Sequence, residues 1–196
     1  LLERSRLLVS NDTGTMHVAA AVGCPVVLVS VGYVHFRETG PYGEGHCAIE
    51  WRRARLGRAD SVQEAEEERA LIQPEQVYGA VEAVLAAQRG GTGQLRATPD
   101  MAPVDLYMSR FAPDQCLQWY PVLRRPLTER DFLRTVYRAM WLDYLGGQRN
   151  PETERESLLL LLGHFDDPEE GAVEGWGESF GAVFQDLAQM AEKGVQ

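Results

Sequence analysis

The sequence is poor in cysteine and has no long hydrophobic run, and each shortage excludes a class of protein. Cys24, Cys47 and Cys116 are the only cysteines in 196 residues, and their wide spacing excludes a disulfide framework and a C-x-x-C zinc site. The longest apolar run, residues 158–162, is far shorter than the ~20 residues of a membrane-spanning helix. We therefore expect no transmembrane segment, no metal site and three small buried thiols in a reducing cytosol.

Positive charge is also scarce, since 19 basic residues face 29 acidic ones and the formal net charge is −10. An acidic surface repels phosphate backbones, so nucleic acid is not an expected partner. Hydrophobic residues make up 44% and charged residues 24% of the chain, which is typical of a folded globular protein and excludes wholesale disorder.

The first fifty residues have the pattern of an α/β unit. Two short apolar runs, 7–10 and 25–30, do not alternate with polar residues, which is typical of parallel strands covered on both faces. Residues 11–23 between them predict a short crossover helix, with Asn, Asp and Thr at its start and Gly23 at its end. We also expect a third strand at 47–49 and a helix at 74–88.

The remainder of the chain predicts helices. Residues 89–104 contain Gly, Thr and Pro and resemble a linker. Beyond it the apolar spacing is helical, with helices expected from Thr128 to Gly146, over 150–162 and over 178–192. The expected domains are thus an α/β lobe over 1–88, a linker over 89–104 and an all-α helical module over 105–196.

The first strand–helix turn is the candidate binding site. Free backbone N–H groups at Thr13, Gly14 and Thr15 would point out of the helix start, where the helix dipole favours an anion. Gly14 would let a phosphate approach the backbone closely. The two threonine hydroxyls could add donors, and His17, about one turn later, could donate to a phosphate or a sugar hydroxyl.

Asp12 needs a different role, because a carboxylate would repel a bound diphosphate. It could cap the helix or accept a hydrogen bond from a sugar or ribose hydroxyl. The residues alone leave a purely structural interpretation open, in which Asp12 and Thr13 are only caps and His17 is a surface histidine. His35 and His46 are interpreted as surface residues beside a Gly-rich loop that could touch a base or sugar.

The segment from Ser10 to Ala21 resembles the signature of glycosyltransferase family 9, the ADP-heptose:lipopolysaccharide heptosyltransferases. In that family a strand leads into D-[ST]-G-x-x-H-x-A-A, then G-x-P-V, then a loop ending R-T-G-P-Y-G. The counterparts here are Asp12 to Ala20, Gly23 to Val26 and Arg37 to Gly43, and residues 72–77 resemble the start of the family's closing helix. The resemblance covers residues ~5–88. It departs at residues 30–33, where the family has F-G-P-T, and at the extra residue Glu38.

The resemblance implies the C-terminal portion of a GT-B, Rossmann-like donor-binding lobe. It assigns the donor diphosphate to Asp12, Thr13 and Gly14 with His17 nearby, and Thr15 joins this set through the helix-start argument. The implied reaction is an inverting transfer of a sugar, expected to be heptose, from an ADP-sugar to a lipid-linked acceptor of the lipopolysaccharide-core type, with no further cofactor.

In the family the acceptor lobe and the acidic base precede this motif by a long way. We therefore expect the chain to be a C-terminal fragment that is inactive by itself and carries no catalytic residue. The resemblance implies a cytoplasmic parent enzyme and leaves open its peripheral association with the inner-membrane face.

Two other functions stay open. One is a non-catalytic scaffold derived from a donor lobe, which would serve as an interaction module. The other is a different GT-B enzyme, such as a nucleotide-sugar epimerase, although these do not usually carry the continuation from His17 to Ala20.

Overall fold

The computed structural model describes residues 1–31, 35–52, 67, 71–90, 99–145, 151–168 and 176, and excludes the side chains of 139–145, 151 and 154. The chain divides into two compact units, Leu1–Arg124 and Arg125–Gln196. The first unit contains the sheet and the candidate site, and the second contains the helices α5 and α6.

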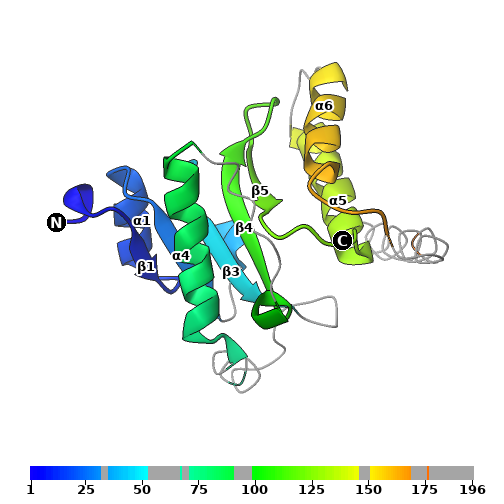
Figure 1. Ribbon diagram of the computed structural model, residues 1–196. Coiled ribbons are helices and arrows are strands. Elements are labelled where there is room, and N and C mark those ends of the chain that lie inside the picture. Colours follow the sequence, from blue (N-terminus) through cyan, green and yellow to red (C-terminus); the bar gives the residue numbers. More distant parts are fainter. Residues whose placement is uncertain are drawn as a thin grey trace, which may run out of the picture. The chain divides into compact units, whose positions relative to one another are not determined.

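A five-stranded mixed sheet forms the centre of the first unit, in the order β1-β2-β3-β4-β5 (Figure 1). The strands β1 (Leu8–Ser10), β2 (Val26–Ser30) and β3 (Cys47–Trp51) are parallel, which confirms the prediction for β1 and β2. The expectation that both faces of β1 are covered is wrong, because Val9 is 45% exposed. The strands β4 (Val104–Phe111) and β5 (Leu117–Pro121) continue the sheet in antiparallel pairing. The α/β class is therefore confirmed for this unit.

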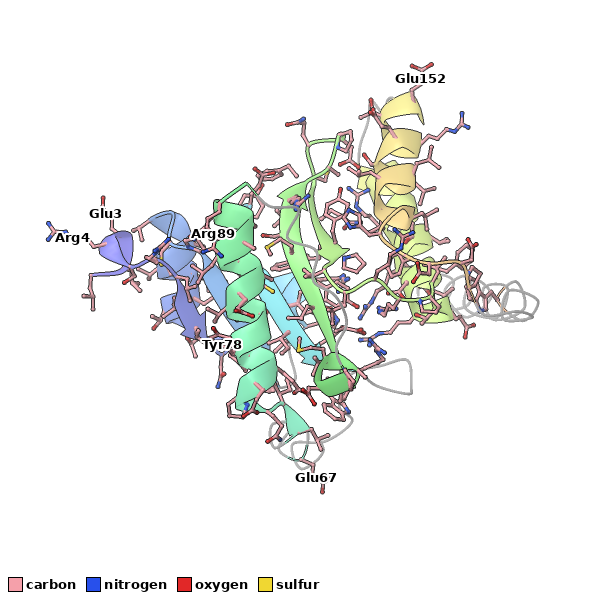
Figure 2. All side chains as sticks on the ribbon, viewed as in Figure 1. Glu3, Arg4, Glu67, Tyr78, Arg89 and Glu152 are labelled. Carbon is pink, nitrogen blue, oxygen red and sulfur yellow. The ribbon has the colours of Figure 1, made fainter. Side chains whose placement is uncertain are left out.

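Helices cover both faces of the sheet. The helix α1 (Gly14–Ala21) connects β1 to β2, and the single turn α2 (Phe36–Thr39) follows β2. The helix α4 (Pro74–Gln88) confirms the prediction for 74–88 and lies in front of the strands in Figure 1. Tyr78, labelled in Figure 2, lies on its outer face and is 62% exposed.

The core has two parts because successive residues of a strand point to opposite faces of the sheet. On the α1 face, Phe36 packs edge-on against Trp119 and tilts against Tyr107, with ring centroids 5.0 and 5.3 Å away. The buried residues of this cluster are Met16, Ala19, Cys24, Val26, Leu28, Phe36, Ala48, Tyr107 and Trp119. Those of the α4 face are Val27, Cys47, Ile49, Ala80, Ala83, Val84, Met101, Val104, Leu106, Met108, Val122 and Leu123.

The prediction of an all-helical module over 105–196 is wrong for its first part. Residues 105–121 lie in or between β4 and β5, and β4 pairs along the whole of β3, from Cys47 opposite Met108 to Trp51 opposite Val104. Six consecutive residues of β4 are buried, because both faces of the sheet are covered. The apolar residues Val104, Leu106 and Met108 alternate with Asp105, Tyr107 and Ser109, which is the period of a strand, so the sequence carried a signal for β4 that the helical prediction did not use.

The second unit is described by α5 (Glu129–Leu145), α6 (Pro151–Leu162) and the segments beside them. These two helices confirm the predictions that begin at Thr128 and at residue 150. The helix expected over 178–192 lies outside the described residues. Backbone hydrogen bonds join the segment before α5 to the segment after α6, since Asp166 N donates to Arg125 O (2.8 Å) and Leu127 N donates to Asp166 O (3.0 Å).

Candidate functional site

The turn between β1 and α1 lies at the carboxyl edge of the three parallel strands. This edge is the usual position of a ligand in an open α/β sheet. Thr13 is the N-cap of α1, with extended backbone angles (φ −145°, ψ 161°), and its carbonyl accepts from Met16 N at 3.0 Å. Among the described residues, the N–H groups of Gly14 and Thr15 have no acceptor. Two donors and the positive end of the helix dipole are therefore available to an anion.

All five predicted site residues, from Asp12 to Thr15 and at His17, are exposed. The Thr13 hydroxyl lies 3.2 Å from Ser10 Oγ. Because Ser10 Oγ donates to Asn11 O at 2.8 Å, the Thr13 hydroxyl is the donor of this pair in the unbound chain. The Thr15 hydroxyl and the His17 ring make no hydrogen bond to the described residues. Their assignment to a donor diphosphate stays a prediction.

Asp12 does not cap the helix. Its Oδ2 accepts a hydrogen bond of 2.7 Å from the hydroxyl of Thr39, and α1 has no side-chain cap. A hydroxyl that donates to a carboxylate at this distance makes a strong, charge-assisted bond. Of the two roles expected from the sequence, helix capping by Asp12 is therefore wrong. Acceptance from a sugar or ribose hydroxyl stays a prediction.

Gly14 is not required by the fold. A Cβ built on it meets no atom within 4 Å, and its backbone has an ordinary helical conformation. The surrounding protein therefore gives no steric reason for a glycine at this position. This observation is consistent with the expectation that the space above Gly14 belongs to a ligand.

The short helix α2 lies beside the turn and was not predicted. His35, its N-cap, accepts a hydrogen bond on Nδ1 from Arg37 N (3.2 Å), so the neutral ring carries its proton on Nε2. That nitrogen lies 3.5 Å from Glu50 Oε2 at the end of β3. The contacts of Glu50 with His35 and of Thr39 with Asp12 join residues that are far apart in the sequence, so local patterns did not predict them. The sequence signal for a role of Thr39 was its position in residues 37–43, the loop that resembles the family.

His46 has a structural role. Its ring accepts on Nδ1 from Val26 N at 3.1 Å, and its backbone pairs with Ser109. Burial lowers the pKa of His46, although a hydrogen bond with the Tyr42 backbone opposes the shift, so the ring favours its neutral form. The interpretation of His35 and His46 as surface residues is wrong, because their side chains are partly and fully buried.

The three cysteines are free, and Cys24 and Cys47 are buried as predicted, while Cys116 is half-buried. Burial raises the pKa of the Cys47 thiol to about 12. Across the described residues, no group of three or more His, Cys, Asp or Glu side chains is placed to hold a metal ion. None of the described helices combines the length and the apolar character needed to cross a membrane.

Comparison with known proteins gives a match for the first third of the chain. No curated protein matches the chain. No solved structure matches it either. Residues 1–66, which run from before β1 to beyond β3 and include the whole candidate site, match the model of glycosyltransferase family 9 (heptosyltransferase), and this part of the chain is accordingly similar to that family.

Proposed function

We propose that the first unit binds the diphosphate of a nucleotide-sugar donor at the β1–α1 turn, as part of a glycosyltransferase with the GT-B fold. The observation that carries the proposal is the exposed start of α1. There the N–H groups of Gly14 and Thr15 have no acceptor among the described residues, within a segment similar to glycosyltransferase family 9.

The chemistry of sugar transfer suits this arrangement. When the bond from the sugar to the diphosphate breaks, negative charge grows on the departing diphosphate. Preoriented N–H groups and a helix dipole stabilise such charge most in the transition state. In this proposal the backbone of Gly14 and Thr15 holds the phosphates, and His17 donates to a phosphate or sugar hydroxyl. Asp12 accepts from a hydroxyl of the donor with the oxygen that Thr39 does not use.

The finer assignments follow the family. The donor would be an ADP-sugar, with heptose as the sugar, and the acceptor a lipid-linked saccharide of the lipopolysaccharide-core type. Transfer would invert the anomeric configuration. The acceptor lobe and the base would come from a part of the enzyme outside these 196 residues, so the chain alone should form no product. Omitting a general base typically lowers a rate by ~10²–10⁴-fold.

Replacing Gly14 by valine tests the site. Titration calorimetry of the 196-residue chain with ADP should show an affinity at least about tenfold lower for Gly14→Val, because a branched side chain would occupy the phosphate position. The matched control is Ala21→Val, which adds the same side chain at the exposed, opposite end of α1.

Ala21→Val should bind ADP as tightly as the natural chain. Equal losses in the two variants would show that valine acts through the helix and not through the site. If the natural chain binds no ADP, the proposed function is wrong and the scaffold alternative is favoured.

A further inference from the structure

The helix α2 contacts the carboxyl ends of β1 and β3, two strands that are not neighbours in the sheet. Its first turn begins at His35, which lies against Glu50 at the carboxyl end of β3, and its last residue, Thr39, reaches Asp12 just beyond β1. The strand β2 lies between these two strands. The single turn therefore spans the sheet edge beside the proposed binding site.

The core holds α2 in place. Phe36 is 1% exposed and packs against Tyr107 and Trp119. A Cβ on Gly40, the residue after α2, would collide with the carbonyl of Phe36 and approach the Trp119 ring to 3.2 Å. Because the chain is packed tightly on both sides of Thr39, the Thr39 hydroxyl has a defined position from which to hold a neighbouring group.

The group that Thr39 holds, the carboxylate of Asp12, could compete with a diphosphate for the start of α1. Asp12 is exposed and lies two residues before Gly14, whose N–H group has no acceptor among the described residues. A free carboxylate at this position is attracted by the same dipole and the same N–H groups that would attract a diphosphate. The bond from Thr39 to Oδ2 restrains the carboxylate on the side of α2.

We propose that Thr39 is a positioning residue, which keeps the carboxylate of Asp12 away from the N–H groups of Gly14 and Thr15 that would bind the diphosphate. This inference rests on the proposed function. Loss of the hydroxyl should release Asp12 toward the helix start and weaken diphosphate binding about two- to fivefold, the size of one exposed charge interaction at a helix end.

The test compares Thr39→Val, which keeps the shape and removes the hydroxyl, with Thr39→Ser, which keeps the hydroxyl. Titration with ADP should give about a two- to fivefold lower affinity for the valine variant and nearly natural affinity for the serine variant. In the background of Asp12→Asn the valine substitution should have no further effect, because the competing charge is gone. Thr135→Val, which removes a hydroxyl bonded to Asp131 O in the second unit, is the matched control and should leave ADP affinity unchanged.

A measurement without ligand separates the positioning role of Thr39 from the proposed diphosphate site. The ¹³C chemical shift of the Asp12 carboxyl should change in Thr39→Val and stay the same in Thr39→Ser. If that chemical shift changes while ADP affinity is unchanged, the positioning role is wrong and the proposed site survives. If Thr39→Val weakens ADP binding equally with and without Asp12→Asn, Thr39 does not act through Asp12 and the inference is overturned. If the natural chain binds no ADP, the proposed function and the positioning role of Thr39 are both wrong.

Discussion

At the scale of single residues, two glycines of the first unit, Gly14 and Gly40, have opposite roles. Gly14 has open space where a Cβ would be, whereas a Cβ on Gly40 would collide with the backbone carbonyl of Phe36. Neither has a positive φ, so backbone conformation does not separate them. Gly40 is therefore required by packing, and Gly14 is free to serve a ligand.

We expect Gly40→Ala to lower the free energy of unfolding by about 2 kcal/mol, as overpacking of a tight contact does. Gly14→Ala should leave it unchanged or raise it slightly, since alanine is the better helix former. Thermal unfolding followed by circular dichroism measures both variants. A loss of stability in Gly14→Ala as large as that in Gly40→Ala would show that Gly14 is also a structural glycine.

In the second unit, Asp131 is the centre of a buried charged cluster. Its two oxygens accept from both terminal nitrogens of Arg125 (2.7 and 3.2 Å), and Oδ2 also accepts from the Thr128 hydroxyl (2.6 Å). Burial by itself raises the pKa of Asp131, but the hydrogen bonds and charge of Arg125 and the bonds from Thr128 outweigh it, so the net shift is downward. The folded unit therefore favours the ionised carboxylate.

Asp131→Asn should destabilise the second unit at neutral pH by about 3 kcal/mol, because it removes the buried negative charge to which Arg125 and Thr128 donate. A lowered folded pKa means that the stabilisation is complete above the unfolded value of about 3.9 and is lost as the pH falls through the folded value. The difference between the variant and the natural chain should accordingly shrink at acid pH.

Hydrogen exchange of the backbone amides in residues 132–138 reports the stability of α5 directly. Asp100→Asn, a change at an exposed carboxylate in the first unit, is the control and should leave this exchange unaltered. A difference between Asp131→Asn and the natural chain that is constant from neutral to acid pH would contradict the role given to the ionised carboxylate.

At the scale of elements, β4 and β5 complete the first unit. Both core clusters lie wholly within residues 1–124, and both draw on these two strands and the segments beside them. A chain that stops at residue 88, the end of the lobe expected from the sequence, loses eight of their buried side chains. These are Met101, Val104, Leu106, Tyr107, Met108, Trp119, Val122 and Leu123.

We expect a chain of residues 1–124 to fold and to bind ADP as the full chain does, whereas a chain of residues 1–88 should not fold. At roughly 1.5–3 kcal/mol of burial each, the larger lost side chains together contribute about as much as, or more than, the ~5–15 kcal/mol of stability of a typical domain. Circular dichroism and ADP titration of the two chains measure this. A folded, ADP-binding 1–88 chain would show that β4 and β5 are accessory to the lobe.

At the scale of the whole molecule, the sequence by itself determined the local elements. The apolar runs at β1 and β2 predicted two parallel strands, although β1 is less covered than expected, since Val9 is 45% exposed. The N-cap at Thr128, with Asp131 three residues later, marked the start of α5 because capping depends on residues that are neighbours in the chain. The exposed start of α1 was predictable for the same reason, since a helix exposes its first N–H groups whatever surrounds it.

Only the tertiary structure decided what depends on residues far apart in the chain. Residues 104–111 and 117–121 joined this sheet because β3 offered a free edge for pairing, and the alternation within β4 does not by itself say which strand it pairs with. The bond from Thr39 to Asp12 joins residues separated by 27 positions, and His46 became a neutral core residue because Val26 and Ser109 enclose it. Such contacts depend on the path of the whole chain, which no local pattern records.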